Sequence, residues 1–291
     1  MDARTRISKY ELQDFLGGAM SHVYKARDTA LGRIVAIKIL TDEGIADSET
    51  KNRFLEEARL SASLSHANII RFYDYGEEDG RPYIVMELLT GETLADAITT
   101  GRYKTVGAKL AVALEIGQAL EYIHSRHIIH RDVKPQNIHI DESCRVKLMD
   151  FGVAKREGLK LTAAGFTLGT PYYMAPEQVQ GRSITHRIDI YAFGIVLLEL
   201  LTGSRPINGS TVERIFDEIV YTPLNLAPLR AMHTPETVCT LIGRCTAKDP
   251  GQRPAGFGDV CRELARILNE DCPGEDERGP RRGIFGLFRR G

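Results

Sequence analysis

The hydrophobic pattern of this 291-residue chain changes near residue 90, and no other feature constrains its fold as much. Before that point, short segments rich in β-branched and aromatic residues alternate with Gly-containing turns, a pattern typical of strands. The predicted elements there are strands over residues 10–16, 22–28, 34–40, 69–76 and 83–87 and one helix over 47–63. Beyond it, apolar residues recur at helical spacing. The sequence therefore predicts an α+β fold with a small β-rich lobe, a larger helical lobe and a hinge near residues 88–92.

Helices account for most of the second part of the chain. The predicted helices are 106–125, 187–201, 211–220, 236–246 and 257–270. The second of these is apolar nearly all round, which indicates a helix buried through the centre of the lobe. Ser210 and Glu213 form a capping-box pattern at the start of the third. We therefore expect one domain over 10–270, with lobes 10–89 and 90–270 and a ligand cleft between them, and a polar, disordered tail over 271–291.

Composition excludes several classes of protein. The chain has 38 Lys+Arg and 39 Asp+Glu, and this near-neutral balance argues against a nucleic-acid-binding protein. Its five cysteines form no C-x-x-C pair, so we expect free thiols and no zinc site. The longest apolar run, residues 190–198, is far shorter than the roughly 20 residues that span a bilayer. Together with the absence of a signal-peptide pattern, this predicts a soluble, cytoplasmic protein.

Two short segments carry side chains suited to phosphate chemistry. Residues 130–137 read HRDVKPQN, and Asp150 opens the triplet DFG. If residues 138–149 form a hairpin, Asp132, Asn137 and Asp150 converge. Asn137 and Asp150 then offer hard oxygen ligands for Mg²⁺, while Asp132 can orient and deprotonate a hydroxyl group. For this motif alone, a polar surface loop is the competing interpretation.

Two further features favour the phosphate interpretation. Lys38 ends the apolar strand segment VAIK, and Glu57 follows nineteen residues later in the predicted helix, where it can hold the lysine toward a phosphate. Residues 169–177 read GTPYYMAPE. Several independent motifs in one chain make a purely structural interpretation of these residues unfavourable.

In this order and at this spacing, the motifs resemble those of the eukaryotic-like protein kinases, and most closely the bacterial serine/threonine kinases, over residues 10–270. The resemblance implies the two-lobed protein kinase fold, with one helix in the β-rich N-lobe and a larger helical C-lobe. It implies ATP and Mg²⁺ as cofactors, with Mn²⁺ as the alternative metal, and transfer of the γ-phosphoryl group to Ser or Thr of protein substrates. The physiological substrate, the activating signal and the oligomeric state stay open.

The resemblance also implies roles for individual residues. Lys38 would contact the α- and β-phosphates and pair with Glu57. Asp132 would be the catalytic base, and Lys134 would contact the transferred phosphoryl group. The implied metal ligands are Asn137 and Asp150. The implied nucleotide-binding positions are Leu16, Gly17, Gly18, Ala19, Met20, Ser21, Val23, Ala36, Lys38, Met86, Glu87, Leu89, His139 and Asp150.

Among the nucleotide-binding positions, five define where adenine is expected to lie. Met86 resembles the gatekeeper residue. The Glu87 carbonyl and the Leu89 amide would read the adenine edge, and Val23 and Ala36 would cover the ring from above. The resemblance therefore implies that the nucleotide binds at the linker between the lobes.

Two positions depart from the family pattern. The glycine-rich loop has Leu16 and Ser21 where glycines are usual, and we expect the leucine to restrict the turn and to affect ATP affinity. His139 stands where an aliphatic residue usually forms the floor beneath adenine. We expect an uncharged ring with a packing role and no catalytic one, since burial disfavours the imidazolium.

Structural and regulatory roles follow from the same resemblance. Glu177 is expected to pair with Arg253, and Asp189 on the central helix to brace the catalytic loop. His130 is expected to pack against Phe151. The candidate phosphorylation sites are Thr162 and Thr167, because Arg131 beside the catalytic aspartate calls for an anion that a phosphate can supply.

Two rival functions remain open. A pseudokinase scaffold is favoured only by the altered glycine loop and is opposed by the intact set of charged and metal-binding residues. A small-molecule phosphotransferase of the same fold is opposed by residues 169–177, which in protein kinases form a platform for a substrate peptide.

The last fourteen residues hold five arginines interleaved with Ile284, Phe285, Leu287 and Phe288. A disordered tail is the favoured interpretation of this segment, and contact with an anionic membrane or a partner is the alternative.

Overall fold

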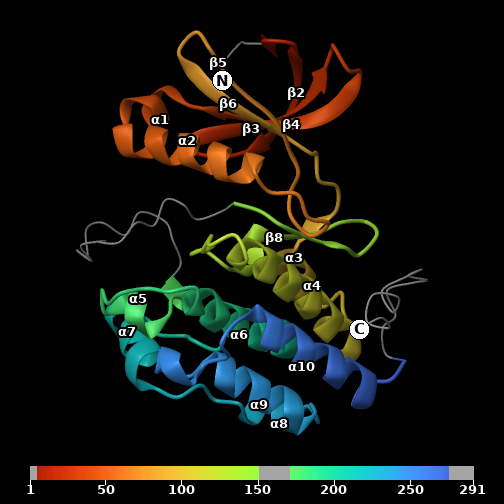
Figure 1. Ribbon diagram of the computed structural model, residues 1–291, viewed down its shortest axis with the longest axis vertical. Coiled ribbons are helices and arrows are strands. Elements are labelled where there is room, and N and C mark those ends of the chain that lie inside the picture. Colours follow the sequence, from red (N-terminus) through yellow and green to blue (C-terminus); the bar gives the residue numbers. More distant parts are fainter. Residues whose placement is uncertain (1–4, 151–170, 275–291) are drawn as a thin grey trace.

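The computed structural model describes residues 5–150 and 171–274, which form two lobes, one above the other in Figure 1. The N-terminal lobe is built on a β-sheet with two helices, and the C-terminal lobe is mostly helical. The predicted α+β, two-lobed fold is thus confirmed. The predictions for Phe151, Thr162, Thr167 and residues 275–291 fall outside the described residues.

A six-stranded antiparallel sheet in the order β1-β2-β3-β4-β6-β5 forms the N-terminal lobe. Its strands are β1 (Arg6–Ile7), β2 (Tyr10–Gly17), β3 (Ser21–Asp28), β4 (Arg33–Leu40), β5 (Phe72–Glu78) and β6 (Arg81–Met86). Helices α1 (Asp42–Ala46) and α2 (Ser48–Ala62) follow β4, and Phe54 of α2 packs with Leu40 and Ile84 of the sheet. The five predicted strands and the helix are confirmed, whereas β1 and α1 are too short to show a hydrophobic period.

One predicted strand begins later than expected. β5 starts at Phe72 and not at residue 69, because the preceding residues pair with β9 (Val146–Leu148) of the other lobe. The Ile70 amide donates to the Leu148 carbonyl at 3.0 Å, and the Leu148 amide donates to the Asn68 carbonyl at 2.8 Å. An apolar run predicts a strand but not its partner.

The C-terminal lobe is a helical assembly around α6. Its helices are α3 (Leu94–Thr99), α4 (Val106–His124), α5 (Pro176–Val179), α6 (Arg187–Thr202), α7 (Val212–Tyr221), α8 (Ala227–Ala231), α9 (Glu236–Cys245) and α10 (Phe257–Glu270). Thirteen of the sixteen residues of α6 are buried, as its apolar sequence predicts. The small sheet β7-β8-β9, made of β7 (Glu92–Thr93), β8 (Ile138–Ile140) and β9, contains the predicted hairpin and lies next to the lobe junction (Figure 1).

One helix cap in the helical lobe differs from the prediction, whereas the cysteines agree with it. The cap of α7 is Thr211, whose hydroxyl accepts from the Arg214 amide at 3.3 Å, so the predicted capping residue Ser210 was wrong by one position. None of the five cysteines, all of which lie in the described residues, forms a disulfide, as expected, and all but Cys144 are buried. Within residues 5–150 and 171–274, no helix combines the length and the apolar character that crossing a membrane requires.

Candidate active site

A lysine whose side chain is 16% exposed joins the two lobes at their junction. Strand β4 places Lys38, whose Nζ donates to both oxygens of Glu57 on α2 at 2.9 and 3.0 Å. The same Nζ lies 3.6 Å from Oδ1 of Asp150, whose side chain is 61% exposed. Burial lowers the pKa of Lys38, but the charges of Glu57 and Asp150 outweigh it and raise the pKa above its usual value. The lysine therefore stays charged and oriented toward Asp150.

The loop before β8 fixes the carboxylate of Asp132. Lys134 Nζ donates to its Oδ2 at 2.8 Å, and Asn137 Nδ2 donates to the same oxygen at 2.9 Å and to the Asp132 carbonyl at 2.9 Å. A 3₁₀ turn over Pro135–Asn137 brings the asparagine back toward the aspartate, and its first residue is proline, whose fixed φ suits a helical start. The structure thus brings together three of the predicted site residues within the segment 132–137.

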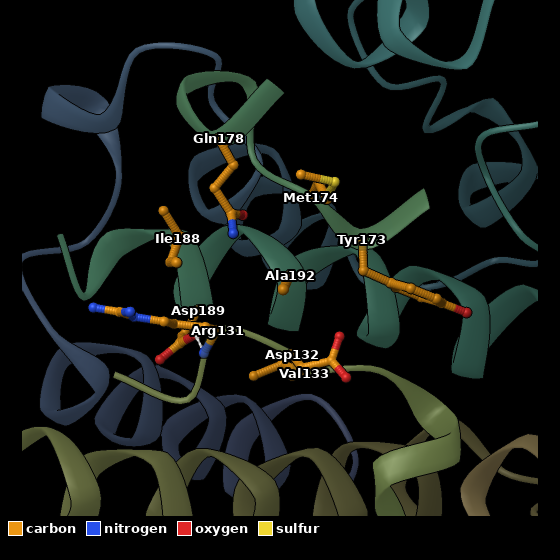
Figure 2. Close-up of a pocket in the computed structure, with 9 residues that line it drawn as sticks. All are labelled: Arg131, Asp132, Val133, Tyr173, Met174, Gln178, Ile188, Asp189 and Ala192. Carbon is orange, nitrogen blue, oxygen red and sulfur yellow. Dashed lines mark hydrogen bonds between the residues drawn. The ribbon is translucent and has the colours of Figure 1, made fainter. Parts of the chain in front are cut away.

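Asp189 of α6 holds this loop through hydrogen bonds to its backbone. Its buried carboxylate accepts from the backbone amides of His130 at 2.8 Å and Arg131 at 2.9 Å and from His124 Nε2 at 2.8 Å. These bonds hold Arg131 at a φ of +66°, a left-handed conformation that arginine rarely adopts. The predicted bracing role of Asp189 is confirmed by this geometry, and Figure 2 shows the link between the aspartate and Arg131.

His130 is fully buried and is held by backbone groups. Its Nε2 donates to the Met149 carbonyl at 3.1 Å, and its Nδ1 accepts from the Asp132 amide at 3.3 Å. Burial lowers the pKa of this histidine. Both bonds suit a neutral ring protonated on Nε2, which orders the loop and does not move protons in a reaction.

The glycine-rich loop connects β2 to β3 and differs from expectation at Leu16. Gly17 and Gly18 have φ values of +138° and +116°, and a Cβ on Gly18 would collide with the Ser21 carbonyl oxygen. Leu16 precedes these positions and keeps a negative φ. The turn therefore has glycine at both left-handed positions, and the leucine does not restrict it as expected.

The linker after β6 is held by side chains of both lobes. The Glu87 carboxylate accepts from the Arg71 amide at 2.7 Å and from Lys147 Nζ of β9 at 2.8 Å. His139 is buried in β8, and its Nε2 donates to the Thr90 carbonyl at 3.0 Å. Neither the Glu87–Lys147 pair nor the tie to Thr90 was predicted, because both partners look like solvated charges or plain loop residues in the sequence.

A crevice extends from Asp132 toward the segment before α5 (Figure 2). Residues from the loop before β8, from this segment, from α5 and from α6 line it: Arg131, Asp132, Val133, Tyr173, Met174, Gln178, Ile188, Asp189 and Ala192. The Tyr173 hydroxyl donates to Glu199 Oε2 of α6 at 2.6 Å. Sequence reasoning missed Glu199, although a carboxylate in an otherwise apolar helix was a signal that it needed a partner.

Helix α5, which follows this segment, is anchored by a buried ion pair. Arg253 Nη1 and Nη2 donate to the two oxygens of Glu177 at 2.7 and 2.8 Å, and the two side chains are 0% and 5% exposed. The guanidinium also donates to the carbonyls of Ala247, Arg187 and Lys248. Every oxygen of the buried carboxylate is therefore paired, and the predicted Glu177–Arg253 pair is confirmed by this geometry.

The available oxygen atoms fit a divalent metal that is completed by other ligands. Asn137 uses its Nδ2 for Asp132, which leaves the amide oxygen as its possible ligand atom, and Asp150 offers an exposed carboxylate. Among the described residues, no cluster of three or more His, Cys, Asp or Glu side chains could hold a metal ion alone. Such an open set suits Mg²⁺, which prefers oxygen ligands and takes the remainder from phosphates and water.

Comparison with known proteins agrees with this geometry. The family model of the protein kinase domain matches residues 10–266. The chain belongs to the protein kinase family. It is 40% identical over 256 residues to the serine/threonine-protein kinase PrkC of Bacillus subtilis, a match that covers 88% of this chain and 40% of PrkC. It is 37% identical over 276 residues to the serine/threonine-protein kinase PknB of Mycobacterium tuberculosis, covering 91% of this chain and 44% of PknB.

Membership of this family implies which nucleotide and which kind of ion the site uses. Protein kinases use ATP together with divalent metal ions. The predicted family and fold are confirmed, and the kinase domain spans only 40% and 44% of the length of these two relatives.

Proposed function

We propose that this chain is a serine/threonine protein kinase that transfers the γ-phosphoryl group of ATP to a Ser or Thr hydroxyl of a protein. The observation that carries the proposal is the Asp132 carboxylate, which is oriented by Lys134 and Asn137 and lines the same crevice as Tyr173 and Met174. The names of the matched relatives and the family model support the same activity.

In the proposed reaction, the protein mainly positions groups and stabilises charge, because the transition state of phosphoryl transfer is loose and little covalent chemistry falls to the protein. Asp132 orients the acceptor hydroxyl and takes its proton. Lys134, 2.8 Å from this carboxylate, is near enough to the acceptor site to stabilise the transferred group. Lys38, held by Glu57, binds the α- and β-phosphates.

Asn137 and Asp150 are the proposed metal ligands, with Mg²⁺ as the physiological ion and Mn²⁺ as the alternative. When bound, the metal would neutralise charge on the phosphate oxygens. We place the nucleotide in the cleft between lobes 10–89 and 90–270 of one domain, against the glycine-rich loop, the linker and His139. We also propose activation by phosphorylation of Thr162 or Thr167, with Arg131 as the anion-binding residue.

Incubation of the purified chain with labelled ATP, Mg²⁺ and one acidic and one basic protein substrate tests the proposal. We expect label on Ser or Thr of a protein, and none with Lys38→Met, which keeps the bulk of the side chain and removes its charge. Nucleotide binding without transfer would indicate a pseudokinase scaffold. Transfer to small molecules alone would indicate a metabolite phosphotransferase.

A further inference from the structure

An exposed arginine stacks on the 3₁₀ turn Pro171–Tyr173, which we call the platform and which lies next to the candidate catalytic residues. Arg205 belongs to the loop between α6 and α7, and its guanidinium carbon lies 4.4 Å from the centroid of the Tyr172 ring. Within the described parts of the chain, no salt bridge to Arg205 is formed. Its planar group is therefore held against an aromatic face while its charge stays available to a ligand.

Two adjacent tyrosines, Tyr172 and Tyr173, lie between Arg205 and the crevice at Asp132. Arg205 stacks on Tyr172, and Tyr173 lines the crevice that Asp132 also lines (Figure 2). Both tyrosines belong to one 3₁₀ turn, Pro171–Tyr173. A peptide that offers a hydroxyl to Asp132 would thus extend over or beside this turn.

Glu199, an acidic group close enough to be influenced by the charge of Arg205, already has a partner. Glu199 accepts from the Tyr173 hydroxyl at 2.6 Å and is half-buried. Burial raises the pKa of Glu199, and the Tyr173 hydrogen bond and the charge of Arg205 act in the opposite direction. The hydrogen bond turns the carboxylate toward Tyr173, whereas Arg205 is an exposed positive charge that stacks on the same turn.

We propose that Arg205 is a specificity-determining residue that selects protein substrates with Asp or Glu near the phosphorylated Ser or Thr. The inference rests on the proposed kinase function and adds the chemical class of its substrates. A guanidinium fork donates two parallel hydrogen bonds to a carboxylate, and stacking on Tyr172 reduces the side-chain entropy lost on binding. The same charge disfavours a Lys or Arg at that place in the peptide.

The test uses matched peptides and the full chain with Mg²⁺ and ATP. Each peptide carries one Thr acceptor and a single Glu, Ala or Lys at one of the four positions on either side, and kcat/KM is measured for each. We expect the wild type to prefer Glu over Lys at one or more positions by about tenfold, and Arg205→Ala to reduce this ratio by about three- to tenfold, the scale of a partly solvated Arg–carboxylate contact.

A matched control comes from a second arginine–tyrosine stack. Arg126 lies 4.0 Å from the Tyr122 ring, is exposed, and neither residue lines the crevice, so Arg126→Ala should leave the Glu/Lys ratio unchanged. Arg205→Lys keeps the charge without the fork and should retain part of the preference. An equal ratio in the wild type and Arg205→Ala, or a wild-type preference for Lys, would overturn the proposal.

The two proposals fail in different ways. Transfer to the peptides with no acidic preference leaves the kinase function intact and removes the role of Arg205. If no peptide is phosphorylated, the kinase function fails, and fluorescence anisotropy then measures binding of the labelled Glu and Lys peptides without ATP. Tighter binding of the Glu peptide that is lost in Arg205→Ala would still support an acidic-peptide site, and equal binding would remove it.

Discussion

The buried pair between Glu177 and Arg253 shows how strongly the segment before α6 depends on one anchor. We predict that Arg253→Met lowers the free energy of unfolding by about 3–5 kcal/mol, because it leaves the Glu177 carboxylate buried without its cation. The side chains are 0% and 5% exposed, so water cannot replace the lost partner without a rearrangement. At about 2–4 °C per kcal/mol for a domain of this size, Tm should fall by about 6–20 °C.

Urea denaturation and calorimetry measure this loss directly. The matched control is Arg244→Met, because the Arg244–Glu263 pair has a similar distance of 2.7 Å but side chains that are 47% and 21% exposed. An exposed pair of this kind contributes less than about 1 kcal/mol. If Arg253→Met does not fold, Arg253→Lys keeps the charge and should show an intermediate loss. A loss for Arg253→Met within about 1 kcal/mol of the control would refute the reasoning.

Three further outcomes are expected. Asp132→Asn should lower kcat by about 10²–10⁴-fold and leave calorimetric ATP binding largely intact, and retention of more than half of the activity would contradict a catalytic base. His139→Leu should change the KM for ATP by less than about tenfold, whereas a kcat loss beyond about 100-fold in steady-state kinetics would place the histidine in the chemistry. Burial lowers the pKa of Lys248 from 10.5 to about 8. The folded state then binds fewer protons than the unfolded chain between these values, so the wild type should gain about 1 kcal/mol over Lys248→Met as pH rises through that window, after allowance for partial exposure. Equal pH dependence of the two proteins in urea denaturation would exclude this.

Local patterns were sufficient to predict the parts of the fold that repeat with a period. The burial of α6 follows from its apolar sequence. The hairpin β8–β9 was only the condition under which Asp150 would approach Asn137, and the structure meets this condition. The Lys38–Glu57 pair was also predictable, since a lysine at the end of an apolar strand needs an ionic partner and the next helix carries one.

Features that depend on long-range packing were not predictable in the same way. Residues 69 and 70 are apolar and fit a strand whatever its partner is. Only the assembled structure shows that they pair with Leu148 across the lobe junction. Thr211 and Ser210 are both good helix caps, so their neighbours in space decide which one is used. The left-handed positions of the loop lie one and two residues after Leu16, at Gly17 and Gly18, so the leucine does not occupy a position that needs glycine, and its effect on ATP affinity stays a prediction.

The buried and half-buried carboxylates show where the limit of sequence reasoning lies. A glutamate inside an apolar helix must find donors, and this much can be read from Glu199 in the sequence. Its donor, the Tyr173 hydroxyl, is supplied by a 3₁₀ turn outside that helix, and Glu87 takes Lys147 from β9 across the lobe junction. Composition and periodicity do not encode such pairings, because they arise when already formed elements dock. The same docking places Arg205 on Tyr172, and for this reason the proposed substrate preference emerges from the structure and not from the kinase motifs.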